Sequence, residues 1–209
     1  MSTTHAEPKF VLGPDHNGMR MTPEEFDAIE NYDDNYRYEL IHGVLIVNPL
    51  PLESESDPNE ELGYLLRYYH EAHPKGISLD KTLSERYVRT TDSRRRADRI
   101  IWAGLGRIPK PKVDIPTIVA EFVSKAKRDQ RRDYVEKREE YMAIGIKEYW
   151  IIDRFKRIMT VITKYRGRVR DQVIQENGIY RTPLLPGFEL PLGRLLSLAD
   201  DWEEIELDA

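Results

Sequence analysis

The chain has 209 residues, of which 40% are hydrophobic and 33% charged, and it contains no cysteine. This length and composition are typical of one soluble globular domain with a sizeable core. The absence of cysteine excludes disulfides, zinc–thiolate sites and thiol chemistry, and no apolar stretch approaches the roughly 20 residues that cross a bilayer. We expect a cytoplasmic protein with one domain over residues 21–195, between a flexible tail over 1–20 and an acidic tail over 196–209.

The net charge of −5 conceals a basic middle section. Residues 63–170 carry 27 Lys+Arg against 14 Asp+Glu, whereas residues 1–62 carry 3 against 14 and residues 171–209 carry 2 against 9. A basic face suits a polyanionic partner such as nucleic acid. The alternative is that the acidic ends pair with the basic middle and only solubilise it.

The first half of the chain shows helix and hairpin signals. Thr22 as N-cap, with Pro23 and Glu25 behind it, predicts a helix that ends at about Asn31. His42-Gly43 between two apolar runs predicts a tight hairpin. The ranges predicted here are strands over 36–41 and 44–47, a loop over 49–58 and a helix over 59–72.

The second half alternates strand-like runs with one long helical pattern, which Gly145 should terminate. The predicted strands cover 84–88, 97–102, 117–123, 148–153, 157–164, 169–175 and 179–182, and the predicted helix covers 129–144. We expect the last two strands to pair with each other. The order strand 117–123, helix 129–144, strand 148–153 predicts a βαβ unit inside a mixed sheet, that is, an α/β (α+β) fold.

Two carboxylates stand on predicted strands. Glu121 interrupts the otherwise apolar run 117–123, where an unpaired charge would be costly. Asp98 precedes the apolar run Ile100–Trp102. Each also has a simpler explanation, since Glu121 could reach solvent or an arginine at a strand end, and Asp98 could be a surface acid neutralised by neighbouring arginines.

Together these acids could form a metal site. Two carboxylates on neighbouring strands can share one Mg²⁺ or Mn²⁺, with waters completing the shell. Lys137, in the helix that follows the Glu121 strand, could orient an attacking water, although a solvated helix lysine is equally compatible with the sequence. Such a set is suited to metal-assisted hydrolysis of a phosphodiester. Phosphate contacts are predicted for Arg94, Arg95, Arg131 and Arg132.

Three segments carry a resemblance to a known family. They are Tyr38–Gly43, Ala97–Ile101, and Val119–Ser124 together with Asp133, Lys137, Tyr141, Gly145 and Glu148–Asp153. In this order they resemble the PD-(D/E)XK nuclease superfamily and, within it, the bacterial Uma family of restriction-endonuclease-like proteins.

The resemblance implies a mixed β-sheet flanked by helices. It also implies Mg²⁺ held by Asp98 and Glu121, Lys137 serving the water, and Glu39 supporting the site. The chain departs from the family pattern at Ala97, where a proline is usual, and at Val123, where the superfamily has lysine. It also has no histidine at the start of the second helix, over residues 56–60.

The sequence thus predicts a Mg²⁺-dependent endonuclease that acts on DNA, most naturally on duplex DNA. A homodimer would let two-fold symmetry present one site to each strand. Two alternatives stay open at this level. One is a catalytically silent nucleic-acid-binding or regulatory protein that keeps the fold, and the other is an interaction module without a nucleic-acid role.

Overall fold

The computed structural model describes residues 10–207, apart from the side chains of residues 128, 129, 165 and 203–207. The chain divides into two compact units. The first unit comprises the chain up to Leu50 together with Thr90–Arg96, and the second comprises Pro51–Arg89 together with the chain from Ala97 onward. The single domain over 21–195 stays a prediction, and the parts of the two predicted tails over 1–9 and 208–209 lie outside the described residues.

The first unit is built around a β-hairpin. Its elements are η1 (Pro14–His16), α1 (Pro23–Asp27), β1 (Tyr36–Ile41), β2 (Val44–Pro49) and the start of β4 (Arg94–Ala103). The predicted capping box at Thr22 and Glu25 is confirmed. So is the hairpin, in which Ile41 pairs with Val44. His42 and Gly43 both have positive φ, the backbone conformation of a tight two-residue hairpin turn.

The N-terminal segment of this unit corrects two expectations. Residues 10–20 are not a loose tail, because Leu12 is fully buried and its backbone pairs with the strand-like segment around Tyr32. The same pairing stops α1 at Asp27 rather than at Asn31. Asn31 O accepts a hydrogen bond from Leu12 N, and Asp33 N donates one to Leu12 O. The backbone groups of Asn31 and Asp33 are therefore bonded to Leu12 and not within a helix.

The second unit contains a mixed sheet. The order of its strands is β4-β5-β6-β7-β8, and β3 also pairs with β4. β5 and β6 are parallel, whereas the pairs β4–β5, β6–β7 and β7–β8 are antiparallel. The strand bounds are β3 Leu79–Arg89, β5 Ile118–Phe122, β6 Glu148–Asp153, β7 Ile158–Tyr165 and β8 Arg168–Gln175. This is the mixed sheet that the sequence predicted, including its βαβ unit.

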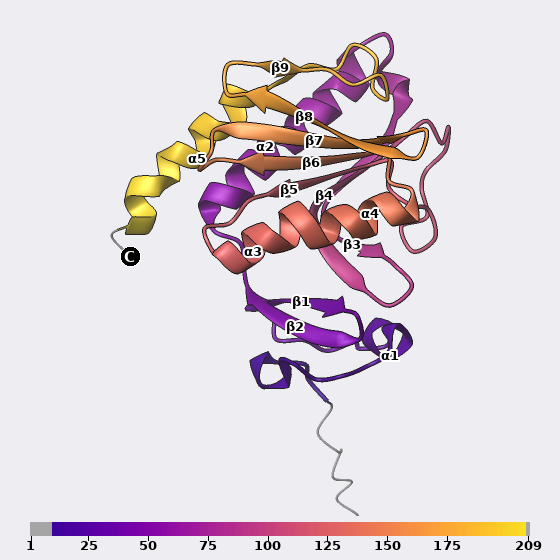
Figure 1. Ribbon diagram of the computed structural model, residues 1–209, viewed down its shortest axis with the longest axis vertical. Helices are drawn as coiled ribbons and strands as arrows, with labels where there is room; N and C mark the ends of the chain where they lie inside the picture. Colours follow the sequence, from indigo (N-terminus) through magenta and orange to yellow (C-terminus); the bar gives the residue numbers. More distant parts are fainter. Residues whose placement is uncertain (1–9, 208–209) are drawn as a thin grey trace, which may run out of the picture. The chain divides into compact units, whose positions relative to one another are not determined.

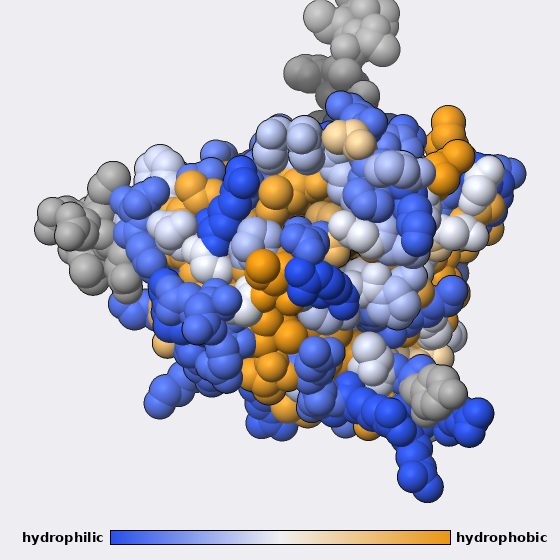
Figure 2. Space-filling model, turned by 90° about the horizontal axis from the view of Figure 1, so that it is seen from above, coloured by the Kyte–Doolittle hydropathy of each residue, from blue (hydrophilic) through white to orange (hydrophobic). Residues whose placement is uncertain are grey.

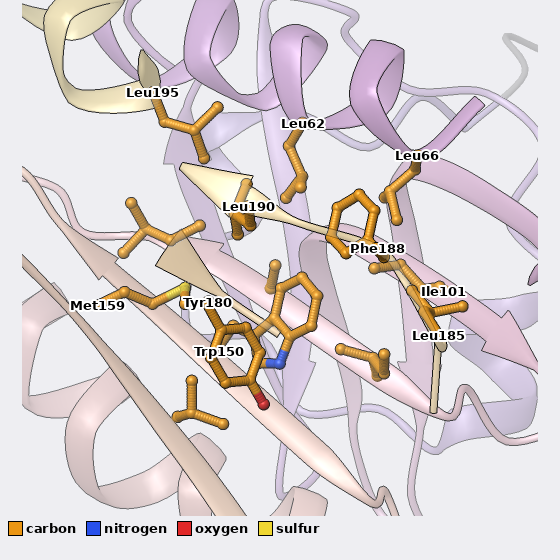
Figure 3. Packing of buried hydrophobic residues seen from close by; sticks show 14 of the residues in the cluster. Leu62, Leu66, Ile101, Trp150, Met159, Tyr180, Leu185, Phe188, Leu190 and Leu195 are labelled. Carbon is orange, nitrogen blue, oxygen red and sulfur yellow. The ribbon is translucent and has the colours of Figure 1, made fainter. Parts of the chain in front are cut away.

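Helices cover both faces of this sheet (Figure 1). α2 (Glu53–Ala72) and α5 (Leu192–Leu207) pack on one face, where Leu62, Leu66 and Leu195 share a core with Ala120 and Trp150. Figure 3 shows these leucines directed toward Trp150, whose ring meets Tyr180 edge to face. The other face is covered by the crossover between β5 and β6, which consists of α3 (Lys127–Arg131), a π-helical turn η3 (Arg132–Glu136) and α4 (Lys137–Ile144).

Four further details differ from the predicted elements. The loop expected over 49–58 is wrong, because α2 begins at Glu53 and carries Pro58 inside it. The expected acidic tail begins within α5, where Leu196 and Ala199 are buried. β8 pairs with β7 rather than with the next strand, and β9 (Ile179–Tyr180) pairs with β10 (Leu190–Pro191). The one long helix predicted over 129–144 is divided by η3.

One surface pocket of the second unit lies apart from the predicted site residues. The C-terminal half of α2 and the segment Gly187–Pro191 enclose ≈ 420 Å³, lined mainly by aromatic and aliphatic side chains. Figure 2, viewed from the side on which β9 lies, shows apolar side chains gathered in the middle of a hydrophilic surface. Across residues 10–207 no helix combines the length and the apolar character needed to cross a membrane.

Candidate active site

Asp98 and Glu121 face each other across β4 and β5. The antiparallel register pairs Arg99 with Ala120 and Ile100 with Val119, and one further step places Asp98 opposite Glu121. At this step Oδ2 of Asp98 accepts a hydrogen bond from the Phe122 backbone N–H at 2.7 Å, so a side chain joins the two strands. Opposed residues of such a pair have Cβ atoms about 4.5–5.5 Å apart, which makes the two carboxylates close neighbours.

Both carboxylates point toward the crossover helix. Side chains alternate between the faces of a strand, and Val119 and Val123, which flank Glu121 at this spacing, pack with Tyr141 of α4. Ile100, two residues beyond Asp98, belongs to the same cluster. The βαβ connection therefore places α4 over the acidic end of β4 and β5.

Lys137 stands at the start of α4 between two acids. Its Nζ lies 2.9 Å from Oε2 of Glu121 and 3.0 Å from Oδ1 of Asp133. The Tyr141 hydroxyl donates to Oε1 of Glu121 at 3.0 Å. Glu121, Asp133 and Lys137 are buried, so these contacts are shielded from water and matter more than they would at the surface.

The acids of this cluster repel one another. Burial raises the pKa of the Glu121 carboxyl well above its ordinary value, Lys137 acts against this, and the charges of Asp98 and Asp133 raise the pKa further. Burial likewise raises the pKa of Asp133, which Lys137 and, more weakly, Arg132 lower. Buried carboxylates that repel one another form a site that an additional cation would stabilise.

The donor atoms fit a hard divalent cation. Asp98 and Glu121 offer carboxylate oxygens, which Mg²⁺ and Mn²⁺ prefer. Within the described part of the chain, no group of three or more His, Cys, Asp or Glu side chains is arranged to hold a metal ion. A cation here would be held by these two carboxylates, and its remaining ligands would be backbone carbonyls or waters, as is usual for Mg²⁺.

The backbone of Asp98 is anchored to α2. Asn59 Nδ2 donates to the Asp98 carbonyl at 2.9 Å, and Arg99 Nε donates to Oδ1 of Asn59 at 2.7 Å. Beside Asp98 lies a pocket of ≈ 70 Å³ lined by residues of α2 and β3, including Glu55 and Glu85. Acidic walls of this kind attract cations.

Glu39 belongs to the first unit, where it lies on β1 and is buried. Its Oε1 accepts from the Arg96 backbone N–H at 3.0 Å and its Oε2 accepts from Asn48 Nδ2 at 3.2 Å. These bonds give Glu39 a structural role within the first unit. Its support of the cluster around Glu121 stays a prediction.

The predicted phosphate contacts are wrong for two of the four arginines, because these two side chains are buried. Arg94 is buried and binds Asp27, with Nε and NH2 each 3.0 Å from Oδ2. Arg95 is completely buried. Neither side chain can reach a phosphate in this conformation. Arg131 is exposed and Arg132 is half-buried, so both remain candidates.

The sequence did not predict the roles of two residues in the cluster. Tyr141 entered only as part of the family resemblance, yet its hydroxyl donates a hydrogen bond to Glu121. Asp133 entered only as part of the family resemblance, yet it binds Lys137 directly. The signal that could have identified them is their spacing, because residues 133, 137 and 141 recur every four positions, the separation of neighbours on one helix face.

Comparisons with known proteins identify a family and a shared fold. A family model, Uma2, described as "Putative restriction endonuclease", matches residues 23–193. A crystal structure of "a putative nuclease belonging to DUF820" from Anabaena variabilis matches with a TM-score of 0.64 and 17% identity, covering 86% of this chain and 99% of that one. At this identity the likeness shows a shared fold. No curated protein matches the chain.

Proposed function

This chain belongs to the Uma2 family of restriction-endonuclease-like proteins, and from that membership we propose that it is a divalent-metal-dependent nuclease that hydrolyses phosphodiester bonds in DNA. One observation carries the proposal. Asp98 and Glu121 oppose each other on neighbouring strands, and the Lys137 ammonium lies 2.9 Å from Glu121. Acidic metal ligands with a cationic neighbour form the apparatus of metal-assisted phosphodiester hydrolysis.

The residues of the cluster take distinct roles in this proposal. Asp98 and Glu121 bind Mg²⁺ or Mn²⁺, and such an ion supplies Lewis-acid stabilisation of the charge that develops on the scissile phosphate. Lys137 orients the attacking water and adds positive charge beside the phosphate. Tyr141 fixes the rotamer of Glu121 through its 3.0 Å hydrogen bond, which keeps the carboxylate in place before substrate arrives.

The proposed substrate is duplex DNA. The family description names restriction endonucleases, and the basic section over residues 63–170 supplies positive charge for a polyanion. Exposed Arg131 lies in the crossover that also carries Lys137. We propose a homodimer as the cutting form, because two-fold symmetry presents one site to each strand.

The test is cleavage of supercoiled plasmid by purified protein with Mg²⁺, Mn²⁺ or EDTA. We expect nicking that requires the metal and that Asp98→Ala lowers by more than about 100-fold. Asp171→Asn is the matched control, since it alters a half-exposed acid that pairs with Arg138 on α4 outside the cluster, and it should cleave like the wild type.

Two results would contradict the proposal. One is the absence of cleavage with either metal, and the other is equal cleavage by Asp98→Ala. If DNA binding persisted in the absence of cleavage, the alternative of a silent nucleic-acid-binding protein would take its place. Melting curves of the variants show whether a loss of activity reflects a loss of fold.

A further inference from the structure

The Lys137 ammonium is held between two buried carboxylates. Nζ lies 2.9 Å from Oε2 of Glu121 and 3.0 Å from Oδ1 of Asp133, and the side chains of these acids are 2% and 7% exposed. Of these two acids, only Glu121 is a proposed metal ligand. The two partners of Lys137 are therefore not equivalent, and Asp133 has no role in the function proposed above.

Metal binding would weaken one of these ion pairs. A divalent cation on Glu121 draws on the same carboxylate charge that attracts Lys137, and the cation and the ammonium repel each other. With Glu121 as its sole anionic partner, Lys137 would either compete with the cation or move away from it. A second carboxylate that does not bind the cation removes this conflict.

The backbone conformation brings Asp133 close to Lys137. In a regular α-helix, residues four apart are offset by about 40° round the axis, so Asp133 and Tyr141 would be offset by about 80°. The π-helical turn η3 lies between Asp133 and Lys137, and Lys137 N–H donates to Arg132 O five residues earlier. This wider turn rotates Asp133 back toward the line of Lys137 and Tyr141. π-helical turns are found often at functional sites.

A further contact fixes Asp133 to the sheet. The Tyr149 hydroxyl, on β6, donates to the Asp133 backbone carbonyl at 3.1 Å. β6 is the strand beside β5, on which Glu121 stands. The helix turn that carries Asp133 is thus tied to the same sheet as the acid that Lys137 also contacts.

We propose that Asp133 is a positioning residue that holds the Lys137 ammonium in the cluster while Glu121 binds the divalent cation. The inference rests on the proposed function and adds to it a separate role for each of the two acids. Glu121 binds the metal, and Asp133 binds the Lys137 ammonium. If the ion pair were only structural, its loss would lower the stability of the fold. It would change neither the metal affinity nor the turnover of the protein that remains folded.

The test combines metal binding with cleavage. Asp133→Asn keeps the shape of the side chain and removes its charge, and Asp171→Asn, in the ion pair with Arg138, is the matched control. We expect Asp133→Asn to bind Mn²⁺ about 10–100-fold more weakly in calorimetry without DNA, as is typical when an outer partner of a metal site is lost. Its kcat should fall by a similar factor. Its Kd for DNA in Ca²⁺ should stay within twofold of the wild-type value.

Asp133→Glu is a second variant, which tests the positioning role even if Asp133→Asn does not fold. It keeps the charge and displaces it by one methylene, so Mn²⁺ affinity should stay within threefold of wild type while kcat still falls. Wild-type kcat in Asp133→Glu, or wild-type Mn²⁺ affinity and kcat in folded Asp133→Asn, would overturn the positioning role. If the wild type neither bound Mn²⁺ nor cut DNA, the proposed function itself would fail first.

Discussion

Glu121 shows at the scale of a single residue why the buried cluster is unfavourable for the stability of the fold. Its carboxylate is buried on a central strand, near Asp98 and Asp133, with one close ammonium. Burial of a carboxylate is costly unless its charge is fully compensated. A cluster of this kind lowers the stability of the fold, and the divalent cation proposed above would offset that cost, which is the balance expected of a functional site.

This imbalance predicts an unusual pH dependence. Burial raises the pKa of Glu121 in the folded state, so the folded protein binds a proton there more tightly than the unfolded chain does. The free energy of unfolding then falls as pH rises above the unfolded pKa of about 4.3 toward the higher folded pKa. In EDTA we expect the wild type to lose stability from about pH 5 upward, and Glu121→Gln to show a smaller loss.

Urea unfolding at a series of pH values measures this slope. The control is Glu189→Gln, because Glu189 is exposed and pairs with Arg181, and it should keep the wild-type slope. A Glu121→Gln variant whose stability runs parallel to that of the wild type over the whole range would contradict the prediction.

The sequence located some site residues and misjudged others for a physical reason. Glu121 was recognisable because a single acid interrupts an apolar strand, and that signal is local. The fate of Arg94 was not recognisable, since its partner Asp27 lies 67 residues earlier in the chain. The role of Tyr141 likewise depends on Glu121, 20 positions away, whereas the spacing of four between Asp133 and Lys137 is a local signal that could have been read.

At the scale of the element, α2 forms against its local sequence preferences. It contains Pro58 and Gly63, both poor helix formers. Ser54, Glu55, Pro58 and Asn59 are nevertheless buried in its first two turns, so packing outweighs propensity. This is why the sequence predicted the amphipathic part from 59 to 72 and missed the start, whereas the capping box, the hairpin and the βαβ unit were predicted from local signals.

Gly63 is required where α2 meets β4. A Cβ at this position would lie 2.7 Å from both terminal nitrogens of Arg99, which is buried and bound to Asn59. Alanine normally stabilises a helix by about 1 kcal/mol relative to glycine. Here we expect Gly63→Ala to lower the free energy of unfolding by about 1–3 kcal/mol, the usual cost of overpacking.

Urea unfolding of Gly63→Ala beside Gly13→Ala tests this. A Cβ at Gly13 would meet nothing within 4 Å beyond its chain neighbours, and the residue has an extended φ of −142°. Its substitution should therefore change stability by less than about 0.5 kcal/mol. Equal or higher stability of Gly63→Ala would mean that the Arg99 guanidinium moves aside freely.

At the scale of the whole molecule, part of the basic charge is used internally. Arg94, Arg95 and Arg99 are buried, so they add little to a surface for DNA. The positive charge available to a polyanion must come from exposed residues such as Arg131. The excess counted over residues 63–170 therefore overstates the surface charge.

We expect duplex DNA binding, measured by fluorescence anisotropy in Ca²⁺, to weaken steeply with salt. Arg131→Ala should weaken binding and reduce the slope of log Kd against log salt concentration by about 1, the value for one lost phosphate contact. Arg181→Ala is the control, because Arg181 is exposed but pairs with Glu189. An unchanged slope in Arg131→Ala would remove this residue from the interface.

The division of the chain between its two units has a consequence for synthesis. The chain passes from one unit to the other after Leu50, after Arg89 and after Arg96. On the ribosome, the β1–β2 hairpin is made early, but the strand segment that pairs with Leu40 at Arg94 follows only after α2 and all of β3 have been made. The first unit therefore stays incomplete until its seven-residue segment Thr90–Arg96 has been made, between two parts of the second unit. Neither unit can be completed before synthesis of the other has begun.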